Sequence, residues 1–133
     1  MPVPLRIAER TVDGLVVLHL DGHLVFDEGD RMLRARVASL VNAGARLLLI
    51  DLHDISYIDS GGIGALGQMS VDVANRGGRL ALLCPSTCAT RVLRVTRLSA
   101  AFEIFQDEAQ ALRSMTEAPP LRPGTPVSRG FRL

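Results

Sequence analysis

The stretch Ile50–Gly67, IDLHDISYIDSGGIGALG, determines how the middle of this chain folds. The apolar run Leu47–Leu52 predicts a buried strand, and a loop is expected from there to Ser60. The apolar spacing then becomes that of a helix, over about 62–75. A turn from a strand into a helix leaves backbone N–H groups at the helix start without partners. This turn is therefore a candidate site for docking a partner or for holding a phosphate.

Strand and helix signals alternate on both sides of this stretch. Asp13–Gly14 is a hairpin signal, and Asn42–Gly44 and Arg76–Gly78 are helix stops. The further expected elements are strands over Leu5–Glu9 and Leu15–Leu20, a loop around Asp21–His23, a helix over Glu28–Val41, a strand over Arg79–Leu83, a helix from Pro85 to about Arg97, a strand over Glu103–Phe105 and a helix from its cap Asp107 to Met115. Alternation after a hairpin predicts an α/β fold with a mixed sheet, parallel where helices make the crossovers. The helix residues expected in the core are Leu33, Val37, Leu40, Val41, Ile63, Leu66, Met69 and Val73.

The composition indicates one globular domain followed by a tail. Of the 133 residues, 47% are apolar and the net charge is +1, so the chain is able to form a core. From residue 117 the sequence reads EAPPLRPGTPVSRGFRL, which is rich in Pro, Gly and Arg. We therefore predict a domain over 1–116 and a disordered tail over 117–133.

The composition also argues against several classes of function. Near-neutral charge and only four Phe, one Tyr and no Trp do not favour nucleic acid or an anionic membrane as a partner. No apolar run reaches the about 20 residues of a membrane span, and the N-terminus lacks a signal-peptide pattern. A cytoplasmic protein is expected. Two Cys do not make a disulfide framework.

Patterns that would indicate nucleotide binding or aspartyl phosphorylation are incomplete. Gly62–Gly67 spells GxGxxG, but a dinucleotide site needs a tighter turn and an acidic residue after the next strand. That strand ends in Leu83–Cys84–Pro85 instead. All 15 basic residues are Arg, so a receiver-type phosphorylation of Asp51 lacks its lysine as well as its acidic metal-binding pair. We predict no enzyme activity and no cofactor.

The remaining candidate ligands do not form a recognisable metal or redox motif. His19, His23 and His53 have no metal-binding spacing, and each is expected to be a packed or surface histidine. Cys84 and Cys88 form C-x₃-C, whereas thioredoxin-type enzymes use C-x₂-C. We expect both to be small buried residues and predict no metal site.

The turn Asp59–Gly64, DSGGIG, resembles the signature of the STAS domain (sulfate transporter and anti-sigma factor antagonist). In that family an IDL-type strand end is followed by Asp-Ser-Ser/Thr-Gly-Leu-Gly at the start of a helix. The segment Val16–Leu24 is similar to the family's early strand and its Gly-x-Leu exit, and the element order matches from about Leu5 to Met115. The resemblance implies a STAS-like mixed β-sheet with an N-terminal hairpin followed by alternating helices and strands.

The resemblance also implies a function in partner switching. Family members of this type bind an anti-sigma factor of serine-kinase type, with a histidine-kinase-like ATPase fold, and so free a sigma factor for transcription. The kinase phosphorylates the antagonist, and a PP2C-type phosphatase resets it. The partner-binding residues implied here are Asp59, Ser60, Gly61, Gly62, Ile63, Gly64 and His23, with Asp59 as the cap of the helix.

Gly61 departs from the family's pattern, because it occupies the position of the phosphorylated Ser or Thr and has no hydroxyl. Three alternatives follow: an unregulated antagonist, a switch moved to Ser60, or a scaffold in a different STAS-based complex. A module that binds a small anionic ligand or a nucleotide at the helix start is the competing class.

Overall fold

The computed structural model describes residues 4–26, 28–83, 86–95 and 102–117 of the chain. Its elements are β1 (Arg6–Val12), β2 (Leu15–Leu24), α1 (Glu28–Asn42), β3 (Leu47–Ile58), α2 (Ser60–Asn75), β4 (Arg79–Leu83), α3 (Thr87–Val95), β5 (Glu103–Phe105) and α4 (Glu108–Glu117). The strands form one sheet in the order β1-β2-β3-β4-β5, in which β1 and β2 are antiparallel and the other neighbours are parallel. The predicted mixed sheet with an N-terminal hairpin is confirmed.

The hairpin turn between β1 and β2 consists of Asp13 and Gly14. Their φ angles are 50° and 83°, the left-handed values that a two-residue turn needs to match the twist of its strands. Glycine adopts such an angle without steric cost. Val12 and Leu15 are consequently register partners, as predicted for a hairpin at this position.

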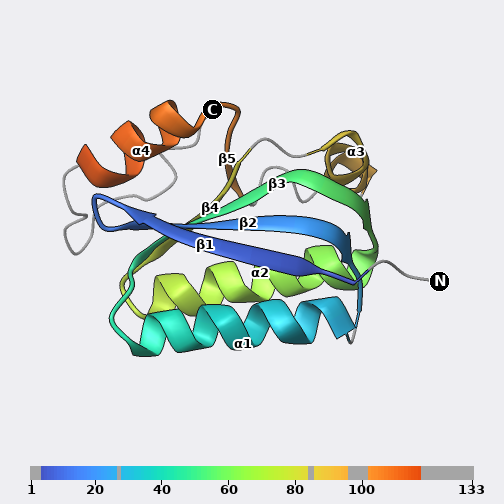
Figure 1. Cartoon of the computed structure of the whole chain (residues 1–133), viewed down its shortest axis with the longest axis horizontal. Helices are drawn as coiled ribbons and strands as arrows, with labels where there is room; N and C mark the ends of the chain where they lie inside the picture. Colours follow the sequence, from blue (N-terminus) through green and yellow to red (C-terminus); the bar gives the residue numbers. More distant parts are fainter. Residues whose placement is uncertain (1–3, 27, 84–85, 96–101, 118–133) are drawn as a thin grey trace.

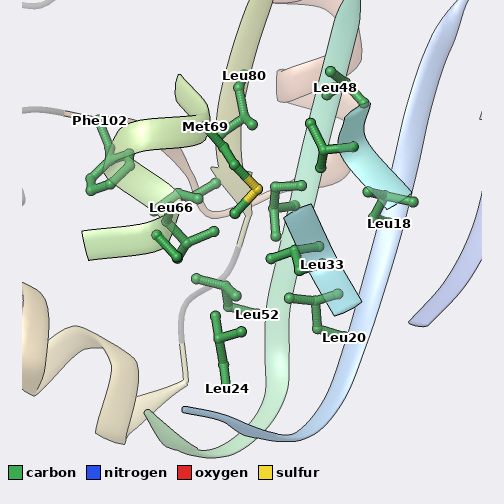
Figure 2. Close-up of a cluster of buried hydrophobic side chains, with 14 of the residues drawn as sticks. Leu18, Leu20, Leu24, Leu33, Leu48, Leu52, Leu66, Met69, Leu80 and Phe102 are labelled. Carbon is green, nitrogen blue, oxygen red and sulfur yellow. The ribbon is translucent and has the colours of Figure 1, made fainter. Parts of the chain in front are cut away.

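Helices cover the two faces of the sheet unequally (Figure 1). α1 and α2 lie side by side on one face, and α4 lies on the other. The main core lies between the sheet and the α1–α2 pair, and Figure 2 shows strand residues such as Leu18 and Leu48 together with Leu33 and Leu66 from the two helices. Under α4 a smaller core contains Leu15, Val17, Leu49, Ala81, Leu83, Ala111 and Met115.

Every helix residue predicted to face the core does so. Leu33, Val37, Val41, Ile63, Leu66, Met69 and Val73 are buried, and Leu40 is a partly buried neighbour of the same cluster. Full burial of one such aliphatic side chain contributes about 1.5–3 kcal/mol. This packing fixes α2, and with it the turn at Asp59, against the sheet.

β2 and β3 both extend farther than the sequence predicts. β2 continues to Leu24 and β3 to Ile58, so the predicted loops at 21–23 and 52–58 are strand. In β2 the loop was predicted at Asp21–His23, although Leu20, Gly22 and Leu24 are buried in the alternation of a regular strand. In β3 the prediction failed because the register of the pair shifts twice, opposite the steps from His19 to Asp21 and from Gly22 to His23 of β2.

The shifts change which residues of β3 are buried. Beyond Asp51 the buried residues are Leu52, Ile55 and Ile58, at every third position. A regular strand buries every second residue of a half-buried run, so the usual sequence signal of a strand is missing here.

β1 runs from Arg6 to Val12, three residues past the predicted end at Glu9, and the remaining predicted elements agree with the structure to within two residues where it describes them. Asp107 caps α4, and its Oδ1 accepts a hydrogen bond from Ala109 N at 3.0 Å. Of the tail predicted over 117–133, Glu117 is the last residue of α4 and 118–133 lie outside the described residues. The predicted end of the third helix near Arg97, Cys84 and the side chain of Cys88 also lie outside them. In the part of the chain that the structure describes, no helix is both long and apolar enough to cross a membrane.

Candidate functional site

Asp59 joins the start of α2 to the end of β2. It is the N-cap of α2, with extended backbone, and its Oδ1 accepts a hydrogen bond from Gly62 N at 2.8 Å. The same carboxylate accepts from Phe26 N, at 3.2 Å and 3.3 Å to its two oxygens. Asp59 N donates to Leu24 O at 3.4 Å. The predicted cap is thus confirmed, and the cap also holds the segment that follows β2.

Gly62 allows α2 to lie directly against β2. A Cβ at this position would meet Leu24 O at 2.3 Å and Ile58 Cγ1 at 3.0 Å. The next residue, Ile63, is fully buried in the core. Both were predicted to bind a partner, and the structure places both inside the protein, where they position the helix start.

Gly61 is covered by Phe26. A Cβ on Gly61 would lie 2.6 Å from Phe26 Cβ and 3.2 Å from Phe26 Cα. Gly61 belongs to α2 and is not among the residues with positive φ, so the contact with Phe26, and not a special backbone angle, is what a side chain here would have to overcome. Residue 61, where the resemblance implies a phosphorylated Ser or Thr, is therefore short of space as well as without a hydroxyl.

The accessible part of the site consists of Ser60, Gly64 and two aromatic side chains. Ser60 and Gly64 are exposed, and a Cβ on Gly64 would meet nothing within 4 Å. Phe26 is 71% exposed and Tyr57 is 51% exposed. His23 of β2 is the register partner of Tyr57 in β3, and their rings lie 5.4 Å apart. We call this set, His23, Phe26, Tyr57, Ser60 and Gly64 around the capped helix start, the docking end.

Phe26 and Tyr57 were not predicted from the sequence. The sequence did contain a usable signal, because aromatic residues are rare in it: four Phe and one Tyr. Tyr57 lies two residues before the predicted turn, and Phe26 lies two residues after the early strand segment Val16–Leu24. Their exposure could not be predicted, since it depends on how far β2 and β3 extend together past their pairing with β1 and β4.

Two of the three histidines lie away from the docking end. His19 lies between two carboxylates of β3, with Nδ1 2.9 Å from Asp51 Oδ2 and Nε2 2.8 Å from Asp54 Oδ2. The hydrogen bond to Asp51 is the largest of the effects that raise the His19 pKa above 6.5, while partial burial opposes it. The side chain is 36% exposed, so the prediction of a packed or surface histidine missed this ion pair. His53 is exposed.

Cation ligands do not converge anywhere in the described residues. No group of three or more His, Cys, Asp or Glu side chains there is arranged to hold a metal ion. The triad of His19, Asp51 and Asp54 illustrates the reason, because its carboxylates approach opposite nitrogens of one ring and share no common centre.

The strands and helices form a small mixed α/β domain in which α2 begins at a capped, partly exposed turn. Comparison with protein families agrees, since the model of the STAS domain matches residues 6–111. The chain belongs to the STAS domain family.

Its relatives include anti-sigma factor antagonists. A protein of Thermotoga neapolitana, named as a homolog of the antagonist TM1081, is 30% identical over 106 residues, which are 80% of this chain and 94% of that protein. The crystal structure of TM1081 from Thermotoga maritima has a TM-score of 0.74 at 24% identity and covers 82% of this chain and 93% of its own. Unphosphorylated SpoIIAA, an antagonist of Bacillus, has a TM-score of 0.70 at 22% identity, with 86% and 99% covered. At these identities the two solved structures show the shared fold.

Proposed function

We propose that this protein is an anti-sigma factor antagonist that binds an anti-sigma factor of serine-kinase type through its docking end, and so releases a sigma factor for transcription. The observation that carries the proposal is the combination of homology to antagonists over 80% of the chain with an exposed, rigidly capped helix start. In this role the protein acts in the cytoplasm as a binding protein, without catalysis of its own.

The chemistry of the docking end suits a protein partner. Aromatic side chains are enriched among the residues that carry most of the energy of protein interfaces. Phe26, which contacts Gly61, and Tyr57, which lies two residues before Asp59, present such side chains at the end of the sheet where α2 begins. Ser60 and Gly64 are the exposed residues of this part of α2. A partner's backbone is able to approach Gly64 closely, because no side chain stands in the way.

The same geometry argues against a small anion as the ligand. An anion at a helix start is held by free backbone N–H groups. Here the Gly62 N–H already donates to the Asp59 carboxylate at 2.8 Å. A phosphate at this point would compete with the protein's own cap and would lie beside its negative charge.

Regulation by phosphorylation is expected to be absent at residue 61. SpoIIAA of Bacillus has been solved in a phosphorylated form, whereas here the acceptor position is Gly61 under Phe26. Ser60 is the adjacent hydroxyl. A phosphate on Ser60 would add about −1.5 to −2 charges next to Asp59 and would oppose docking. A PP2C-type phosphatase would be needed only in that case.

Binding assays with the serine-kinase-type anti-sigma factors of the same genome test the proposal. We expect one of them to bind the wild-type protein in calorimetry and Asp59→Ala to weaken that binding by more than tenfold, which corresponds to about 1.4 kcal/mol. Asp72→Ala is the matched control, since it removes the same charge from α2 at an exposed position about 20 Å along the helix. Ser60→Glu should also weaken binding. If both docking-end variants bind like wild type, the interface lies elsewhere, and if no such kinase binds, the role as an antagonist of this type is wrong.

Incubation with the bound kinase and ATP tests the regulatory part. We expect the intact mass of the wild-type protein to remain unchanged. Rapid gain of one phosphate that maps to Ser60 would show that the switch has moved by one residue and has not been lost. Binding of ATP or an inorganic anion by the protein alone, seen in a thermal-shift screen, would favour the ligand-binding class instead.

A further inference from the structure

The first register shift of the β2–β3 pair is a bulge that changes the direction of a carboxylate. His19 pairs with Asp51, and Asp21 pairs with Asp54. β3 therefore advances by three residues over the length in which β2 advances by two. In a regular strand, side chains three positions apart point to opposite faces of the sheet. The extra residue brings Asp54 to the face on which Asp51 and His19 already lie.

Hydrogen bonds hold this bulge from both sides. His19 contacts Asp51 with one ring nitrogen and Asp54 with the other, at 2.9 Å and 2.8 Å. The second oxygen of Asp51 accepts from His53 N, inside the bulge, at 3.0 Å. One side chain of β2 is thus tied to the residues before and after the irregular step of β3.

We propose that His19 is a proton-controlled clamp, which as an imidazolium holds β2 to the bulge of β3 and as a neutral ring releases Asp54, so that the carboxyl ends of the two strands loosen. The reason lies in the number of donors. An imidazolium has two N–H groups, one for each carboxylate, whereas a neutral imidazole has one N–H and one lone pair. After deprotonation, the lone pair faces a carboxylate oxygen at contact distance, and that contact becomes repulsive.

The charges around His19 favour the protonated state. Its largest favourable contact is the hydrogen bond to Asp51, and Asp54 adds to it. By register, its neighbour in β1 is the uncharged Ala8. The other charged groups of β1 are Arg6, Glu9, which is paired with Arg36 of α1, and Arg10, which is paired with Glu108 of α4. The further charged or titratable groups on the strands and helices that pack here are Asp21 of β2, the exposed His53 of β3, Arg113 of α4 and the exposed Arg91 and Arg94 of α3.

The clamp lies between the regular part of the sheet and the docking end. Beyond the bulge a second extra residue, Ser56, donates from Oγ to Gly22 O at 3.3 Å. The pair His23 and Tyr57 follows, and Asp59 comes directly after β3. A loss of the clamp would therefore reach the residues of the docking end first. The clamp itself needs no partner, while its effect on binding rests on the proposed function.

Ring titration by NMR on the full chain tests the ionisation. We expect His19 to titrate above 6.5, because the two carboxylates favour its protonated form. Asp54→Asn keeps the shape of the side chain but removes its charge, and it should lower the His19 pKa. His53→Gln is the control and should leave the His19 pKa unchanged. A His19 pKa at or below 6.5 in the wild-type protein would overturn the proposal.

Amide hydrogen exchange between about pH 5 and pH 9 tests the loosening, after correction for the intrinsic rate of each amide. Because the closed strands bind the His19 proton more tightly than the open strands, deprotonation shifts the opening equilibrium toward the open strands, and their amides lose protection. We expect this loss of protection at 54–58 as His19 deprotonates, and no change in β4. Asp54→Asn should remove the pH dependence. Protection at 54–58 that does not follow the His19 titration would refute the clamp.

The two proposals fail separately. Exchange and titration are measured on the free protein, so a negative result there leaves kinase binding untouched. If the clamp is present and no kinase binds, only the proposed function falls. If both hold, the affinity for the kinase should fall as the pH rises through the His19 pKa.

Discussion

Replacing Gly62 with Ala tests the close contact on which the docking end is built. An added Cβ would lie 2.3 Å from Leu24 O and 3.0 Å from Ile58 Cγ1. Leu24 O is a backbone atom that also accepts the hydrogen bond from Asp59 N. It is therefore unable to move away unless the start of α2 separates from β2.

The magnitude follows from two opposing effects. Forcing an extra methyl group into a packed contact costs about 1–3 kcal/mol, and a clash with backbone points to about 3 kcal/mol. Alanine favours a helix interior over glycine by about 1 kcal/mol. The net loss for Gly62→Ala is then about 2 kcal/mol, which lowers the melting temperature by roughly 8 °C for a domain of this size.

Gly64→Ala is the matched control, because it lies in the same helix and removes another glycine of the same motif. Gly64 is exposed and has nothing within 4 Å of an added Cβ. Only the helix preference remains, so stability should rise by about 0.5–1 kcal/mol and the melting temperature by roughly 2–4 °C.

Thermal unfolding followed by far-UV circular dichroism, with urea unfolding as a second measure, decides between these outcomes. The two variants should shift in opposite directions. If Gly62→Ala melts at or above the wild-type temperature, the contact with Leu24 O is not as close as the structure has it. The explanation of why Gly62 is needed would then be wrong.

Three further predictions address the switch position, the tail and the histidine clamp. Gly61→Ser should be accepted as a kinase substrate only together with Phe26→Gly, which removes the Cβ that would lie 2.6 Å from a Cβ at residue 61, and phosphate gain by mass spectrometry checks this. Deletion of 118–133 should leave the melting temperature nearly unchanged, and a fall of several degrees would mean that the tail packs on the domain. Because the His19 pKa is raised in the folded protein, its stabilising effect is full below about pH 6.5 and is lost as the pH rises through the raised pKa. The urea midpoint of the wild-type protein should exceed that of His19→Gln at low pH, and this difference should shrink as the pH rises through the His19 pKa. A difference that stays constant with pH would contradict the prediction.

The secondary structure was predictable where residue pattern and local geometry agree. Arg79–Leu83 and Glu103–Phe105 were predicted with the bounds that the structure has, and α1 and α2 to within two residues, because apolar spacing and turn residues mark their ends. The cap at Asp59 was predictable for the same reason, since a capping side chain acts on amides only three residues away.

The ends of β2 and β3 were not predictable in this way. Their bulges put Leu52, Ile55 and Ile58 in the core at every third position, a pattern that a sequence does not distinguish from a loop. The ion pair of His19 with Asp51 and Asp54 depends on the same irregular step, so it was missed together with the strand.

The sequence by itself determined the order of the elements, the hairpin, the helix faces and the capped turn, since these follow from interactions between residues close in the chain. Only the tertiary structure decided which glycines of the turn are accessible. Gly61 and Gly62 are covered by Phe26 and Leu24, more than 30 positions away, and Gly64 is open. Such contacts depend on how β2 and α2 pack across the sheet, and no spacing within the turn encodes them. The same packing leaves Phe26 and Tyr57 exposed at the end of the sheet where α2 begins, and this is the surface through which we propose that a partner binds.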